Sequence, residues 1–137
     1  MGTTPPNGES HKQLGFEPGQ VVQEFGYGED VDEEVRATIA GATGQALEDE
    51  DFDEVVDGVV LWWRDDDGDL TDMLLDVLTA LDDGGLVWLF TPKAGRPGAV
   101  PHAEIEEAAT TAGLHAMSTV AVGAEWSGTR LGTRKGR

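Results

Sequence analysis

The sequence lacks cysteine altogether, which excludes disulfide bonds, thiolate metal sites and thiol catalysis. It also lacks any apolar run approaching about 18 residues, so no membrane span is predicted. Residues 1–10 are polar and contain no apolar segment typical of a secretion signal. We therefore expect a cytoplasmic protein with no membrane association.

Basic residues are scarce and unevenly placed. The sequence contains nine Lys and Arg residues against 27 Asp and Glu residues, which gives a formal net charge of -18. Residues 1–92 carry a net charge of -20, whereas residues 93–137 carry +2. A chain this anionic is repelled by nucleic acid, and the basic C-terminal tail holds too few charges to reverse that. We therefore expect a protein partner rather than DNA or RNA; the oligomeric state is left open.

The length of 137 residues fits one domain with a sizeable core. Residues 1–13 are rich in Gly, Pro, Thr, Asn and Ser without periodicity, which predicts a disordered lead. Residues 14–134 are predicted to form a single α/β domain, and residues 135–137 a basic tail.

Apolar patterning predicts five strands and three helices. Nearly continuous apolar runs indicate strands that are covered on both faces, as in a parallel sheet. Within one such run Trp62 and Trp63 are expected to face opposite sides of the sheet. The predicted strands are Gln20–Phe25, Val55–Trp63, Leu86–Thr91, His115–Val122 and Trp126–Arg134.

Helix start signals lie between these strands. Asp30 stands three residues before Glu33, the spacing of a capping box, Asp69 can cap a second helix, and Pro101 suits the first turn of a third. Gly84 and Gly85 are expected to end the second helix. The acids around Asp69 are interpreted as a turn and cap, and no metal site is predicted. Alternating strands and helices favour a three-layer, Rossmann-like α/β sheet of about five strands with about three helices.

Several strings resemble class I methyltransferases, which use S-adenosylmethionine. Residues 78–87 (Leu-Thr-Ala-Leu-Asp-Asp-Gly-Gly-Leu-Val) are similar to that family's helix, Gly-Gly turn and following strand, and residues 112–114 to its helix exit before two closing strands. Residues 21–28 (Val-Val-Gln-Glu-Phe-Gly-Tyr-Gly) are similar to its first strand and glycine loop. Asp30 stands where a third glycine belongs, and only about 27 residues separate Gly28 from Val55. The resemblance therefore implies a truncated methyltransferase core.

The same resemblance implies a cofactor site. Glu24, Gly26 and Gly28 would line a methionine and ribose pocket, and Glu48 or Asp49 would hydrogen-bond the ribose hydroxyls. The physical basis is that glycine lets a ligand approach the backbone and a carboxylate accepts two hydroxyl protons. A tight strand-to-helix turn needs the same glycines, so S-adenosylmethionine is a possible cofactor and no other is predicted.

The whole chain resembles more closely an actinobacterial family of small acidic proteins of unknown function. Four unusual strings carry this resemblance: Gly19–Glu24, Glu29–Asp32, Leu61–Arg64 and Thr91–Gly98. The resemblance supplies no activity.

The segment Thr91–Gly98 is a second candidate site. It follows a buried strand, where ligands gather in open α/β sheets, and it is stiffened by two prolines. Lys93 and Arg96, joined by Arg64, would present cations to an anion or an acidic partner, unless they pair with the protein's own acids. No catalytic constellation is recognisable.

Three functions remain open from the sequence. We favour a non-catalytic interaction or regulatory protein. The alternatives are a domain or methyltransferase-like enzyme that binds S-adenosylmethionine or a nucleoside, and an acidic mimic of nucleic acid.

Overall fold

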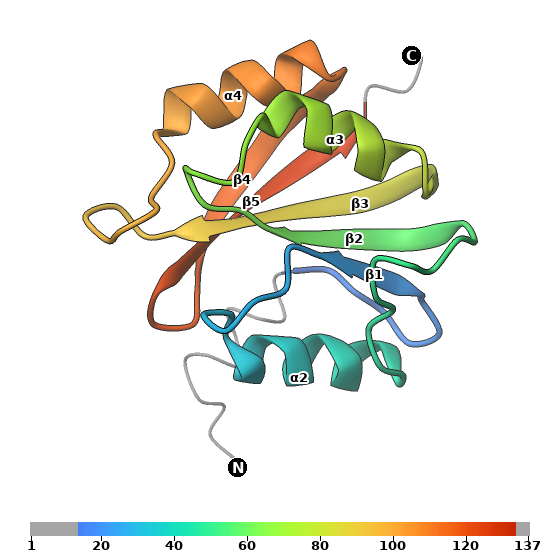
Figure 1. Ribbon diagram of the computed structural model, residues 1–137. Helices are drawn as coiled ribbons and strands as arrows, with labels where there is room; N and C mark the ends of the chain where they lie inside the picture. The colour runs from blue at the N-terminus through green and yellow to red at the C-terminus, as the bar shows by residue number, and fades with distance from the viewer. Residues whose placement is uncertain (1–13, 134–137) are drawn as a thin grey trace.

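The computed structural model describes residues 14–133 (Figure 1). The predicted disordered lead, 1–13, and the predicted basic tail, 135–137, lie outside the described residues. In the part of the chain that is described, no helix is both long enough and apolar enough to cross a bilayer.

One mixed sheet forms the centre of the molecule, with strand order β1-β2-β3-β5-β4. The first three of these strands run parallel to one another, and β5 is antiparallel to both of its neighbours. The strands are β1 (Val22–Phe25), β2 (Val56–Trp62), β3 (Leu81–Pro92), β4 (Leu114–Val122) and β5 (Trp126–Thr133).

The prediction of five strands omitted a position at the edge of the sheet. An isolated parallel bridge pairs Gln23 with Glu48 beyond β1. The Glu48 N–H donates to the Val22 carbonyl at 2.9 Å, and the Glu24 N–H donates to the Glu48 carbonyl at 2.8 Å. The sheet therefore has a sixth strand position. No apolar run marks it in the sequence, because a single bridging residue is held by its backbone.

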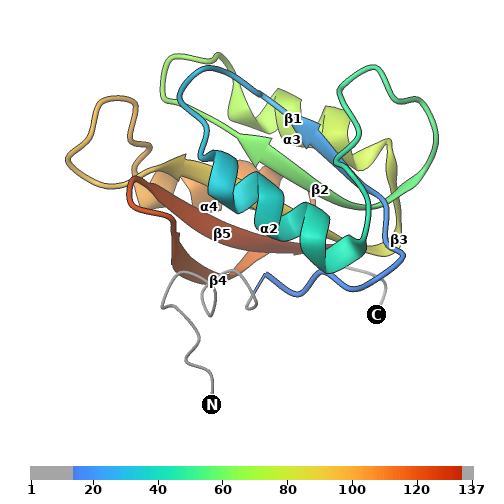
Figure 2. The ribbon, with the colours of Figure 1, turned by 90° about the horizontal axis from the view of Figure 1, so that it is seen from below.

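Helices cover both faces of the sheet, as Figures 1 and 2 show. Helix α2 (Glu33–Thr43) lies on one face, and α3 (Leu70–Leu78) and α4 (His102–Thr111) lie on the other. Trp62 belongs to the apolar cluster on the α2 side and Trp63 to the cluster under α3 and α4, as the strand alternation predicts. The predicted mixed α/β architecture in three layers is confirmed.

The predicted N-cap of the first helix is wrong, and the predicted N-cap of the second is confirmed. Helix α2 is capped by Asp32, whose carboxylate accepts the Glu34 and Val35 N–H groups, because the Asp30 side chain is bound to Arg64 instead. The predicted cap of α3, Asp69, accepts the Asp72 N–H at 3.2 Å and is confirmed.

The Gly84–Gly85 pair does not end a helix but lies inside β3. Pairing between β2 and β3 passes from Val56 opposite Leu81 directly to Gly58 opposite Leu86. The additional residues of β3 therefore bulge out of the ladder, a place where strands commonly carry glycine.

Candidate functional site: the glycine loop and the strand ends

The glycine loop that follows β1 passes very close to the end of β2. Gly26 has φ 78°, a conformation that favours glycine, and a Cβ at this position would lie 2.1 Å from the Trp62 carbonyl oxygen. The turn therefore needs glycine at position 26 for its own backbone geometry, whether or not a ligand is bound.

The side chain of Arg64 fills the space over this loop. Its Nη1 donates to the Gly26 carbonyl at 2.8 Å and to the Trp62 carbonyl at 3.1 Å, and its Nε donates to Asp30 Oδ2 at 3.0 Å. Its Nη2 also binds Asp30 Oδ1. A Cβ on Gly28 would lie 3.2 Å from Arg64 Nη2, so the second glycine accommodates this arginine. The Arg64 side chain is only 16% exposed.

Neighbouring groups hold the Arg64–Asp30 pair in place. The Arg64 guanidinium lies over the Trp126 ring, 5.4 Å from its centroid, and Trp126 Nε1 donates to the Asp30 carbonyl at 3.1 Å. The hydrogen bond from Arg64 holds the pKa of Asp30 below its ordinary value. Burial alone would lower the pKa of Arg64, but the hydrogen bond and charge of Asp30 raise it overall. Both groups therefore stay charged at neutral pH.

The candidate cofactor acid Glu24 is fully engaged inside the protein. It is 5% exposed and forms a two-point ion pair with Arg36, with Nε to Oε2 at 2.7 Å and Nη2 to Oε1 at 2.9 Å. Trp62 Nε1 also donates to Glu24 Oε2 at 2.8 Å. The hydrogen bond from Glu24 is the main cause of a raised pKa at Arg36. Glu24 thus joins β1 to α2 and to the centre of the sheet.

The candidate ribose acids lie beside β1, but a different acid contacts the glycine loop. Glu48 forms the isolated bridge, and the Asp49 carbonyl accepts from Gln23 Nε2 at 2.9 Å. Glu50 Oε2 accepts the Gly26 N–H at 2.8 Å. Sequence reasoning missed Glu50, because nothing in the spacing distinguishes it within a run of acids.

Arg64 and Arg96 of the second candidate site pair with different acids. The 93–98 loop packs on the stem of Arg64, since a Cβ on Gly98 would lie 3.3 Å from Arg64 Cβ. Arg96 pairs with Glu125 at 2.7 Å, and the Lys93 N–H donates to the Glu125 carbonyl at 2.9 Å. The guanidinium of Arg64 is directed to the glycine loop. The structure thus brings the loop and Arg64 together, but the guanidinium groups of Arg64 and Arg96 bind different acids.

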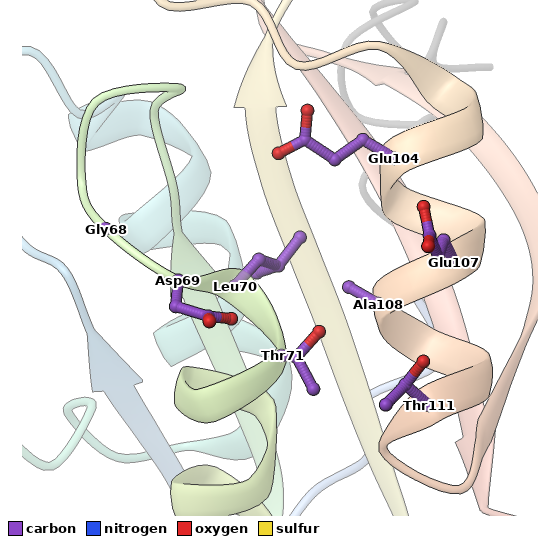
Figure 3. A pocket seen from close by; sticks show the side chains of 8 residues that line it. All are labelled: Gly68, Asp69, Leu70, Thr71, Glu104, Glu107, Ala108 and Thr111. Carbon is purple, nitrogen blue, oxygen red and sulfur yellow. The ribbon is translucent and has the colours of Figure 1, made fainter.

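Two hollows lie away from the glycine loop. One of about 350 Å³ lies beside Pro92, beneath the loop and the start of α4, and its lining includes the hydroxyl residues Thr91, Thr119, Ser127 and Thr129. Another, of about 410 Å³, lies between α3 and α4 and is bordered by Asp69, Glu104 and Glu107 (Figure 3). Neither is lined by Gly26 or Gly28.

Comparison with known protein families identifies close sequence relatives. Residues 11–135 match a family model described as Protein of unknown function (DUF3052). The uncharacterized protein Rv2239c of Mycobacterium tuberculosis is 51% identical over 126 residues, which cover 92% of this chain and 79% of that protein. The uncharacterized protein Mb2263c of Mycobacterium bovis matches with the same identity and coverage. The resemblance to an actinobacterial family of unknown function is confirmed.

Solved structures of methyltransferases share the fold. The pyocyanin biosynthetic protein PhzM superposes with a TM-score of 0.69 at 14% identity, covering 93% of this chain and about half (54%) of PhzM. The cyclopropane synthase MmaA2 from Mycobacterium tuberculosis gives 0.59 at 13%, covering 93% and 82%. Magnesium protoporphyrin IX methyltransferase from Synechocystis, solved with bound SAM, gives 0.54 at 13%, covering 97% and 86%. At these identities the likeness shows the fold alone, and the methyltransferase-like layout is confirmed.

Proposed function

The chain belongs to the DUF3052 family of unknown function, and from this premise we propose that it is a non-catalytic interaction protein built on a methyltransferase-like fold. One observation carries the proposal: the Arg64 guanidinium occupies the glycine loop where a cofactor would have to approach the backbone.

The polar groups of the loop are already satisfied by the protein itself. The Gly26 carbonyl accepts from Arg64, and the Gly26 N–H donates to Glu50. Both oxygens of Glu24 accept hydrogen bonds as well. A ligand would have to displace the charged Arg64–Asp30 pair and then satisfy each group again. The loop is therefore proposed to be a structural joint between β1, β2 and α2.

The proposal is tested by measuring the free energy of urea unfolding with and without about 1 mM S-adenosylmethionine or S-adenosylhomocysteine. A ligand with a Kd of about 10 μM would add about 2.7 kcal/mol of stability at this concentration. We expect no change for the wild-type protein. Stabilisation of the wild type by either nucleoside would overturn the proposal.

A second candidate function is binding of S-adenosylmethionine, favoured by the left-handed Gly26 at the end of β1 and by a structural neighbour that was solved with SAM bound. In that function Arg64 would have to leave the loop. The variant Arg64→Ala distinguishes the two, with Lys93→Ala as a control that removes a cation outside the loop. Binding by the wild type and by both variants would support the second candidate. Binding by Arg64→Ala alone would show that Arg64 closes the site, as we propose.

A further inference from the structure

An acidic recess opens at the edge of the sheet, on the same side as α3. It has a volume of about 330 Å³ and lies between β1, residues 50–55 and the C-terminal end of α3. Four carboxylate side chains line it, and no Lys or Arg is among its lining residues: Glu50, Asp53, Glu54 and Asp76.

One residue that lines the recess carries a buried acceptor without a partner. Gln23, which lines the recess, is 1% exposed, and its Nε2 donates to the carbonyls of Asp49 and Phe52, both at 2.9 Å. These two bonds fix the orientation of the amide, because a flipped amide would place its oxygen against two carbonyl oxygens. Gln23 Oε1 then has no hydrogen-bond partner among the described residues. A buried acceptor left unpaired is costly, so a donor at this position would be stabilised.

Apart from Thr79, the other lining residues are apolar. Phe25 and Phe52 pack partly buried against the core, and Val55 is 64% exposed at the recess. An apolar surface with carboxylates around it matches a group that has a hydrocarbon stem and a cationic head. Lysine and arginine side chains have this form and bury their stems in such surroundings.

A metal ion does not fit the same residues. Within residues 14–133, no three acidic or histidine side chains converge closely enough to hold one. The carboxylates of the recess come from two segments, residues 50–54 and α3, which suits a cation whose donors point in several directions. An arginine guanidinium has five N–H donors in one plane.

We propose that this recess binds an arginine side chain presented by a partner protein, with the guanidinium donating to Gln23 Oε1 and to the surrounding carboxylates. The exposed Val55 then packs against apolar residues that flank the arginine. This inference rests on the proposed interaction function and names the chemistry of the partner.

The test uses an acetylated and amidated heptapeptide with one central arginine between two leucines, titrated into ¹⁵N-labelled full-length protein and followed by NMR. We expect shifts at the Gln23 side-chain amide and at the backbone of Phe52 and Val55. Replacing the arginine of the peptide with citrulline, which keeps the shape but removes the charge, should weaken binding about tenfold or more.

Matched variants locate the binding on the protein. Asp53 and Glu54 are exposed, so the double variant Asp53→Asn/Glu54→Gln should fold normally and weaken the peptide about tenfold. The control Asp65→Asn/Asp66→Asn removes the same charge from an exposed loop outside the recess and should leave the affinity within about twofold.

Equal affinity for the citrulline peptide, or equal loss in both double variants, would overturn the inference. Tighter binding of spermidine than of the peptide at the same residues would overturn the assignment to a protein partner. If the peptide results overturn the inference and S-adenosylmethionine does not stabilise the wild type, the proposed function still stands. Stabilisation by S-adenosylmethionine would instead overturn that function and leave a positive peptide result standing.

Discussion

Replacing Gly26 with alanine tests whether backbone proximity accounts for the glycine loop. The new Cβ would lie 2.1 Å from the Trp62 carbonyl oxygen, a separation that requires β1 or β2 to move. Gly44 supplies a matched control, because it has a similar φ of 86° and nothing lies within 4 Å of its Cβ position. Both variants place an alanine at a positive φ, which is unfavourable. Only Gly26→Ala also brings the new Cβ against the Trp62 carbonyl oxygen.

The magnitudes follow from these two terms. An alanine in the left-handed region costs about 1–2 kcal/mol, partly offset by about 0.4–1 kcal/mol of lost freedom in the unfolded chain. We therefore expect Gly44→Ala to lose about 1 kcal/mol of the free energy of unfolding. Relieving the contact at Gly26 should add about 1–3 kcal/mol, as overpacking of a core does. Gly26→Ala should then lose about 2–4 kcal/mol.

Urea unfolding followed by tryptophan fluorescence measures both variants, with the slope against urea checked for equality. If Gly26→Ala lost no more stability than Gly44→Ala, the close approach of β1 to Trp62 would be refuted. The glycine would then require another explanation, such as space for a ligand.

Three further predictions concern the charged groups around the loop. Asp32→Ala should lower the free energy of unfolding by about 1 kcal/mol in urea titration, since it removes the N-cap of α2. Glu24→Ala should lower it by about 3 kcal/mol because Arg36 loses its buried partner, and a loss below about 1 kcal/mol would contradict this. The pKa of Asp30 is lowered mainly by the hydrogen bond from Arg64, so the pair's contribution is complete above the unfolded pKa of about 4 and is lost as the pH falls through the lower folded value. The stability difference between wild type and Arg64→Met should therefore shrink between about pH 5 and pH 2, and a constant difference would count against the pair.

Apolar patterning predicted the layers of the fold well. The continuous apolar run around Trp62 and Trp63 predicted a strand buried on both faces, and the two rings do enter opposite clusters. The prediction was right because a strand that is covered on both faces needs an apolar residue at nearly every position, and the sequence shows this directly. The edge position at Glu48 was missed because one backbone bridge leaves no such pattern.

The contacts within the candidate site could not be predicted from the sequence, for a different reason. Arg64 and Asp30 are 34 positions apart, and an arginine's direction is fixed only once β1, β2 and the 93–98 loop are in place. Tertiary contacts likewise decide that Glu50 and Gln23, and not similar residues beside them in the sequence, make the hydrogen bonds described above. The residue types were visible in the sequence, but their pairings depend on contacts between distant segments.

The position of β5 has a consequence for how the chain can assemble. This strand follows β4 in sequence yet lies between β3 and β4, and β4 pairs with no other strand in the described sheet. A chain that ended at Val122 would therefore lose an interior strand rather than an edge, and β4 would have nothing to pair with. During synthesis the parallel half of the sheet can form early, but the antiparallel half has to wait for Trp126–Thr133. Until then β3 and β4 expose open edges, and these are places where the nascent chain can pair with a wrong strand.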